Sequence, residues 1–124
     1  MTNKPFRFGP VALTTTLTTN ILNPGTTTGG VASTSAPYDK LRIILTHIRI
    51  VNKTGSAATV SLWVGATGAN AAGTEFAFQA TSVAANSYEN WYGRMPLDTT
   101  DFLVGGAGTT TALTIQGEGE IGVA

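Results

Sequence analysis

The chain has 124 residues, seven basic and seven acidic side chains, and a net charge of zero at pH 7. Its length predicts one domain around one core. Its 42% hydrophobic and 11% charged residues argue against a disordered chain. Because affinity for nucleic acid comes largely from basic groups that neutralise phosphates, the neutral charge argues against nucleic acid, and likewise against an anionic membrane surface, as a partner.

The residue types that are missing or abundant narrow the class further. Cysteine is absent, so the chain has no disulfide, thiolate metal site or cysteine nucleophile. No apolar run suits a signal peptide or approaches the ~18 residues of a membrane span, so we expect a protein made and folded in a cytoplasm. Thr, Ala and Gly fill 53 of the 124 positions, a composition typical of strands and turns.

The first ten residues, MTNKPFRFGP, are predicted to form an extended arm, because Pro5 and Pro10 prevent regular pairing. The arm contains two of the five Phe residues, and each ring would bury well over ~100 Å² if it docked. One hypothesis is that the arm attaches the protein to a partner through the residues Lys4, Phe6, Arg7 and Phe8. The other is that the arm folds back over its own domain and covers a sheet edge.

Two segments follow the arm. Residues 11–22, VALTTTLTTNIL, place apolar side chains at odd positions with Thr between them, which predicts a strand. Residues 23–37 are polar and carry Pro near both ends, which predicts a long connection. Because connections of this length are uncommon in compact domains, we expect a binding loop or an arm segment here.

Residues 41–51, LRIILTHIRIV, form the strongest strand pattern. Apolar residues lie at even and odd positions, so we expect this strand in the middle of a sheet or at an interface between subunits. The candidate interface residues are Leu41, Ile43, Leu45 and His47. A turn at NKTGS follows, and residues 58–64 then alternate regularly, which predicts that the two segments form a β-hairpin.

The next two segments are also predicted to be strands. Phe76 and Phe78 share one face of the short segment TEFAFQA. Residues 85–97, ANSYENWYGRMPL, read as a strand that Gly93 interrupts and Pro96 ends.

The C-terminal part completes the pattern. Residues 97–106 predict a turn and a short strand, and residues 113–123 alternate from end to end. Seven or eight short strands without a helix predict an all-β, single-domain antiparallel β-sandwich of jelly-roll type. We expect residues 1–10 to be its arm and residues 11–124 to be the sandwich.

The candidate reactive residues each have a structural alternative. His47 is the only histidine, and without a G-x-S-x-G elbow we expect it to have a structural or interface role. Glu118 and Glu120 would project in parallel from one strand face, which suits a solvent-facing row better than a glycosidase. Asp98 and Asp101 are expected to form a turn, because a calcium shell needs more oxygen ligands. We therefore expect no enzymatic activity, metal or cofactor.

The aromatic run SYENWY points to a different class of function. Tyr88 and Tyr92 share one strand face, and Trp91 lies on the other. Sugar-binding modules align aromatic rings on an exposed face, so Tyr88, Trp91 and Tyr92 form a candidate glycan platform, which Trp63 could join. The alternative is that large rings fill volume in a core otherwise made of Val, Ile and Ala.

Two segments of the chain resemble small structural proteins of tailed bacteriophages. They are THIRIVNKTGSAATVSLWVG and VAANSYENWYGRMPLDTTDFLVG, in which strands, an N-x-T-G turn and an AANS turn follow one another within residues 41–123. The resemblance implies a virion component, most plausibly a decoration (cement) protein on the outside of the capsid, made in the host cytoplasm. It implies the major capsid protein and copies of itself, as a homotrimer, as partners. It implies no catalytic residues.

Two functions from different classes therefore follow from the sequence. The first is a non-enzymatic decoration protein that binds and stabilises a phage capsid. The second is a carbohydrate-binding or tail-fibre module that recognises a host glycan. A domain of this size buries only ~60–68% of its unfolded surface, so association into an oligomer would add stability in either case.

Overall fold

Eight strands and no helix make up the part of the chain that the computed structural model describes, which is residues 4–24, 41–68, 70, 73–98, 100–109 and 112–123. Within these residues, no helix is long and apolar enough to cross a membrane. The strands are β1 (Lys4–Ala12), β2 (Asn20–Leu22), β3 (Leu41–Asn52), β4 (Ala58–Gly65), β5 (Thr81–Val83), β6 (Ser87–Leu97), β7 (Phe102–Ala107) and β8 (Leu113–Val123).

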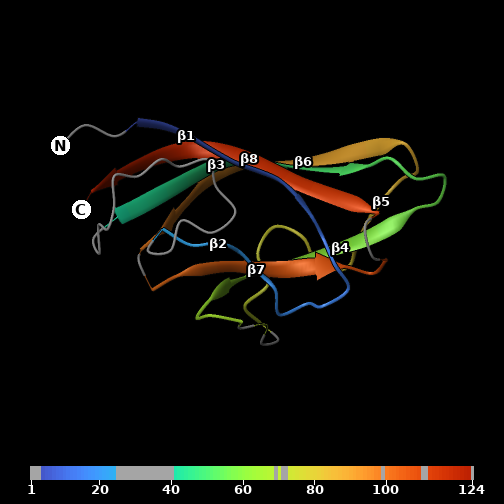
Figure 1. Ribbon diagram of the computed structural model, residues 1–124, viewed down its shortest axis with the longest axis horizontal. Coiled ribbons are helices and arrows are strands. Elements are labelled where there is room, and N and C mark those ends of the chain that lie inside the picture. Colours follow the sequence, from blue (N-terminus) through green and yellow to red (C-terminus); the bar gives the residue numbers. More distant parts are fainter. Residues whose placement is uncertain are drawn as a thin grey trace.

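The strands form two four-stranded antiparallel sheets that face each other as two layers (Figure 1). One sheet has the order β1-β8-β3-β6 and is called the β3 sheet below; the other has the order β2-β7-β4-β5 and is called the β4 sheet. The first strand pairs with the eighth, the second with the seventh, the third with the sixth and the fourth with the fifth. The predicted all-β antiparallel sandwich is confirmed.

The core lies between the two sheets, as the alternation in the sequence predicts. In β8, Leu113 and Ile115 are fully buried, while the carboxylate side chains of Glu118 and Glu120 are exposed on the opposite face. Val60 and Leu62 of β4 meet them from the other layer as fully buried members of the same core cluster. Buried apolar area of this kind supplies most of the favourable free energy of folding.

The N-terminal segment is a strand of this sandwich. From Lys4 onward it pairs with β8 as β1, at the edge of the β3 sheet, and the rings of Phe6 and Phe8 lie in the core with 5% and 0% of their surfaces exposed. Gly9, at φ 77°, allows the bulge that separates the two paired parts of the strand. Residues 4–10 are therefore not a free arm, because burying two aromatic rings outweighs the pairing lost at the two prolines; residues 1–3 lie outside the described residues.

The Thr-rich segment is not one strand. Val11 belongs to β1 and Ile21 to β2, while residues 13–19 form an irregular loop. Backbone carbonyls of Thr14 and Thr19 in this loop accept hydrogen bonds from the N–H groups of β7, which keeps the loop against the β4 sheet. Of the predicted connection at residues 23–37, only the first two residues lie within the described part.

The apolar pattern of β3 has a different cause from the one expected. A register shift between Leu45 and His47 marks a β-bulge at Thr46, so the inward face changes from odd to even positions along the strand. Ile43 and Leu45 before the bulge and Ile48 and Ile50 after it are all fully buried in the same core. The strand therefore does not have two apolar faces.

The predicted hairpin between β3 and β4 is wrong, since the two strands belong to different sheets. The chain crosses between the layers at a corner organised by Asn52, whose side chain is fully buried. Its Nδ2 donates to the carbonyls of Ser56 and Val83 at 2.9 and 3.0 Å, and its Oδ1 accepts from the N–H of Thr54 at 2.9 Å. These bonds hold the turn away from the two-residue hairpin geometry.

The β6 strand follows the prediction more closely than the segment before it does. Its pairing with β3 shifts register between Tyr92 and Met95, so the ladder is irregular at the predicted interruption, Gly93, and the strand ends at Leu97, one residue after Pro96. Because β6 is an edge strand, the missing N–H of Pro96 costs no ladder hydrogen bond. Phe76 and Phe78 are buried, as their shared face predicts, but they lie in an irregular segment next to β4 in which Ala77 has a φ of 67°.

Candidate binding surface on the outer face of the β3 sheet

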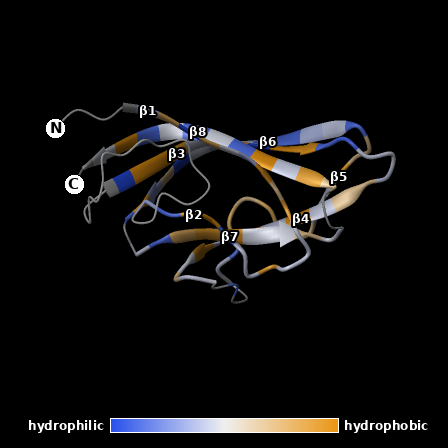
Figure 2. Cartoon of the chain, in the orientation of Figure 1, coloured by the Kyte–Doolittle hydropathy of each residue, from blue (hydrophilic) through white to orange (hydrophobic). Residues whose placement is uncertain are grey.

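Charge is confined to one of the two sheets. The strands of the β3 sheet contain all four arginines of the chain, the single histidine and three glutamates, whereas no strand of the β4 sheet, as described, contains a charged residue or a histidine. Figure 2 shows this as hydrophilic stretches along the β3 sheet and white to orange colours along β7 and β4. Because the inner faces are apolar, the polar groups of the β3 sheet lie mainly on its outer face.

Pairing aligns four polar side chains in one row across this face. Arg7 of β1 lies opposite Glu118 of β8, Glu118 lies opposite His47 of β3, and His47 lies opposite Tyr92 of β6. Directly opposed residues have Cβ atoms about 4.5–5.5 Å apart, within reach of side-chain contacts. The row therefore extends across all four strands, with side-chain contacts between Glu118 and His47 and between His47 and Tyr92.

His47 is the centre of this row. Its Nδ1 lies 3.4 Å from Oε1 of Glu118, its Nε2 lies 2.9 Å from Oδ1 of Asn90, and its ring stacks on Tyr92 with the centroids 4.7 Å apart. Both ring nitrogens face acceptor oxygens, so an imidazolium donates to both, whereas a neutral ring donates to only one. These contacts connect His47 with β6 and β8, while 17% of its side chain remains exposed on the outer face.

A second set of contacts connects β3 with β6. Nε of Arg49 donates to Oδ1 of Asn90 at 3.0 Å, and the Arg49 guanidinium lies 4.7 Å from the centroid of the Tyr88 ring. A cation over an aromatic face at this distance is a favourable contact. Arg49 is therefore held by a neutral amide and a ring, and its charge is not neutralised by either.

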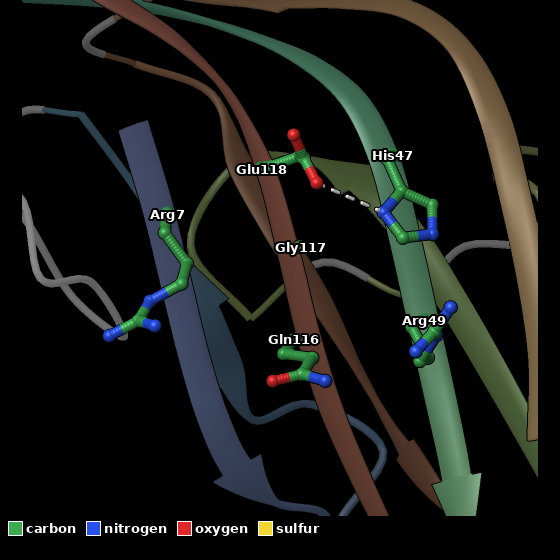
Figure 3. Close-up of a pocket in the computed structure, with 6 residues that line it drawn as sticks. All are labelled: Arg7, His47, Arg49, Gln116, Gly117 and Glu118. Carbon is green, nitrogen blue, oxygen red and sulfur yellow. Dashed lines mark ion pairs between the residues drawn. The ribbon is translucent and has the colours of Figure 1, made fainter. Parts of the chain in front are cut away.

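Between these groups the outer face has a hollow of about 360 Å³. In Figure 3, β1 contributes Arg7 on one side, β3 contributes His47 and Arg49 on the other, and β8 forms the floor. The lining residues are Arg7, His47, Arg49, Gln116, Gly117 and Glu118. Gly117 lines the hollow with its backbone, since a Cβ there would point inward, against the Phe8 ring and 2.6 Å from the carbonyl oxygen of His47.

The residues predicted for attachment separate onto two faces. Phe6 and Phe8 stack near each other in the core, with ring centroids 6.4 Å apart, so neither ring is available to a partner. Arg7, between them, is exposed on the outer face and lines the hollow. Lys4 begins β1, and its side chain lies outside the described residues. The hypothesis of an arm folded back over a sheet edge is the one that this arrangement matches.

The residues predicted for an oligomer interface separate in a similar way. Ile43 and Leu45 are in the core of the same chain and cannot contact another subunit. His47 reaches the outer face, with 17% of its side chain exposed. Leu41 begins β3, and its side chain is outside the described part.

The three aromatic residues of the predicted glycan platform do not form one surface. Tyr88 and Tyr92 are 53% and 69% exposed on the outer face, whereas Trp91 faces inward and packs edge-on against Phe76, with the ring centroids 4.8 Å apart. Trp63 is buried in the β4 sheet. Two of the four rings thus remain for recognition, and two fill volume.

The acidic candidates have the structural roles expected of them. Glu118 and Glu120 are exposed on one face of β8. Asp98 and Asp101 close a turn, since the N–H of Asp101 donates to the Asp98 carbonyl at 2.9 Å and the N–H of Asp98 donates to Oδ2 of Asp101 at 3.0 Å. Within the described ranges, no group of three or more His, Asp or Glu side chains is placed to hold a metal ion.

Arg49, Gln116 and Asn90 belong to the surface but were not singled out from the sequence. Each faces outward on its strand, which the alternation alone could indicate, but their proximity depends on the pairing of β3 with β6 and β8. Comparisons of the chain with protein-family models, with curated proteins and with solved structures found no match. The functional argument therefore depends on this surface and on the sequence resemblance.

Proposed function

We propose that the chain is a virion structural protein that binds the outer surface of a tailed-phage capsid and stabilises it. The observation that carries the proposal is the outer face of the β3 sheet. Arginine, histidine and glutamate side chains line a hollow there beside two exposed tyrosines, while the strands of the opposite sheet carry no charge. Arginine and tyrosine are enriched where proteins bind one another, because they combine large contact areas with directed hydrogen bonds.

The strand order supports a structural role on a virion. The orders β1-β8-β3-β6 and β2-β7-β4-β5, with the chain halves paired in reverse, support the jelly-roll arrangement that the sequence predicts. Jelly rolls are frequent in capsid proteins, although a fold alone does not assign a function. The resemblance of residues 41–123 to phage structural proteins adds the biological context.

The homotrimer is part of the same proposal, and the resemblance is now its sole support. The pattern that suggested an intersubunit strand is accounted for by the bulge at Thr46 and the burial of the neighbouring isoleucines in one core. Light scattering at tens of micromolar protein is expected to give the mass of a trimer. A monomer at this concentration would contradict it.

The test of the proposed function is reconstitution on phage heads. The heads come from a phage that naturally encodes the chain, in a strain from which the gene for the chain has been deleted. Tagged protein is added to these heads, and the heads are sedimented. We expect saturable binding at a fixed number of copies per head, and heads that withstand a higher temperature after binding. Binding that does not saturate, or that occurs equally to unrelated particles, would contradict the proposal.

Two matched variants assign the binding to one sheet. Tyr92→Ala removes the most exposed ring of the outer face, and we expect head binding to weaken about tenfold or more, as for a residue near the centre of an interface. Thr59→Ala changes an exposed residue of the β4 sheet and is expected to leave binding unchanged. Equal effects of the two variants would contradict the assignment of the binding face.

The exposure of Tyr88 and Tyr92 favours one alternative, a module that recognises a host glycan. Each ring has one face in contact with the protein itself, with His47 against Tyr92 and the Arg49 guanidinium against Tyr88, and its other side is available to a sugar. A glycan array measures this directly. Binding to a defined glycan that is lost in Tyr92→Ala, together with no binding to heads, would replace the capsid proposal.

A further inference from the structure

The hollow on the outer face has one end that is rich in positive charge. Arg7 of β1 and Arg49 of β3 stand on either side of Gln116 of β8 (Figure 3). Their strands are two spacings apart, about 9.6 Å. In Figure 3 the Arg7 guanidinium lies on the side of β1 away from Gln116, so this long side chain would turn toward β8 to join Arg49 on one small anion placed over Gln116. The Gln116 amide adds an N–H donor at the floor of the same position.

Negative charge is held at the other end of the hollow. The Glu118 carboxylate is directed toward His47, with Oε1 and Nδ1 3.4 Å apart, and in Figure 3 it lies on the far side of Gly117 from Gln116. Gln116 and Glu118 project from the same face of β8 two residues apart, so a bound anion over Gln116 would lie roughly 7 Å from this carboxylate. The hollow therefore has Arg49 and Gln116 toward one end and Glu118 with His47 toward the other, while Arg7, which lies opposite Glu118 in the pairing, borders it from β1.

The two arginines are available to a ligand. Neither Arg7 nor Arg49 forms an ion pair with any residue in the part of the chain that the structure describes, whereas Arg42 in the same sheet is paired with Asp98 at 2.9 Å. Arg49 is oriented by the neutral amide of Asn90 and by the Tyr88 ring. A guanidinium that is already oriented loses less conformational entropy when it binds a carboxylate.

We propose that this end of the hollow binds a carboxylate, and that the ligand is an acidic side chain on the protein surface to which the chain attaches. Carboxylates fit the donor fork of arginine better than other common anionic side chains, and such charge-assisted bonds are the strong ones. The hollow opens onto a broad sheet face rather than into an enclosed cavity, which suits a side chain that projects from a protein. The naming of a protein partner rests on the proposed function, but carboxylate binding itself does not.

The direct test is a two-dimensional NMR titration of the full chain with a capped tetraglutamate peptide at low salt. We expect the largest shifts at the side-chain N–H groups of Arg7, Arg49 and Gln116. Replacing either arginine, in Arg7→Gln or Arg49→Gln, is expected to weaken peptide binding about fivefold or more. The matched control is Arg94→Gln, the same change of charge in the same sheet outside the hollow, which is expected to change affinity less than about twofold.

A substitution at the acidic end gives an effect of opposite sign. Glu118→Gln removes the nearest negative charge, so we expect peptide binding to become about twofold to fivefold tighter. A neutral tetraglutamine peptide is expected not to bind. Equal losses in Arg94→Gln and in the two hollow variants would show unspecific attraction and overturn the site, and so would weaker binding in Glu118→Gln.

Three further outcomes separate the source of the carboxylate from the proposed function. Shifts at the same groups with glucuronate but not with the peptide would overturn the protein ligand in favour of an acidic sugar. If wild-type protein binds heads and the Arg7→Gln, Arg49→Gln double variant binds them equally well, the carboxylate inference fails while the capsid proposal stands. If the peptide binds in the hollow but heads are not bound, the carboxylate site stands and the protein partner named for it fails with the capsid proposal.

Discussion

The two sheets of the sandwich share one core but differ on their outer faces. The outer face of the β3 sheet carries Arg7, His47, Arg49 and Glu118, partly open to solvent. On the β4 sheet the corresponding face includes Val104, which is fully buried although it does not belong to the central core cluster. The same alternating strand pattern thus produces two different outer faces. The outer face of the β3 sheet is open to solvent or partners, and the outer face of the β4 sheet is covered by other parts of the same chain.

The difference arises from the loops. Over the β4 sheet, the loop at residues 13–19 approaches so closely that a Cβ at Gly106 would lie 2.6 Å from the carbonyl oxygen of Thr14. Asn20 connects this loop to the next one, with its Nδ2 2.8 Å from Oγ1 of Thr67 and its Oδ1 accepting from the N–H of Gly68 at 2.8 Å. A covered face tolerates small and apolar residues but not charges, which explains why the charges are on the other sheet.

The largest expected effect is the introduction of a charge on the covered face. Val104→Lys would place an unpaired ammonium where the side chain has 0% exposure, and we expect a loss of about 4–5 kcal/mol or more in the free energy of unfolding. Val51→Lys, on the half-exposed outer face of the β3 sheet, is the matched control and should cost less than about 1 kcal/mol. Urea denaturation measures both, and similar losses would remove the distinction between the faces.

The next prediction compares the inner and outer faces of the β3 sheet. Phe8→Ala removes a fully buried ring from β1, and we expect a loss of about 3–5 kcal/mol, because a cavity forms between the sheets. Tyr92→Ala removes a ring that is 69% exposed and is expected to cost about 1 kcal/mol or less. Thermal and urea unfolding give the two values. A Phe8→Ala variant as stable as the wild type would mean that the N-terminal segment is not part of the core.

A smaller loss is expected at the corner that takes the chain from one sheet to the other. Asn52→Ala leaves the buried carbonyl of Val83 and the N–H of Thr54 without their partner, so we expect a loss of about 2–3 kcal/mol. Asn20→Ala, which removes the half-exposed amide that connects the two loops of the β4 sheet, is the comparison and should cost about 1 kcal/mol. The reverse order of the two losses would show that the loops, rather than the corner, organise the crossing.

Much of this fold can be predicted from the sequence, and the exceptions have physical reasons. The alternation in β8 is regular because no bulge interrupts it, so both its burial and its exposed glutamates follow from the pattern. In β3 the bulge at Thr46 produces apolar residues of both parities, which cannot be distinguished by periodicity from a strand with two apolar faces. The prolines of β1 argued against a strand, but an edge position tolerates them.

Less of the candidate surface than of the fold could be predicted from the sequence. Arg7 lies 40 positions from His47 and 111 from Glu118 in the numbering, and only the pairing of β1 and β3 with β8 brings the three together. The sequence identified His47 and Tyr92 as unusual residues. It could not identify Gln116 as the floor of a hollow, because nothing in its local pattern differs from any other solvent-facing residue of a strand.

The smallest expected effect concerns the charges of the open face. Arg42 and Asp98 form an ion pair at 2.9 Å with half or more of each side chain exposed, and pairs of this kind contribute little because water and salt screen them. We therefore expect Arg42→Gln to change the free energy of unfolding by less than about 0.5 kcal/mol, in low salt and in high salt. Urea denaturation at two ionic strengths measures this, with Asp98→Asn as the reciprocal control. A loss above about 1.5 kcal/mol that disappears in high salt would mean that the charges of the β3 sheet serve folding rather than binding.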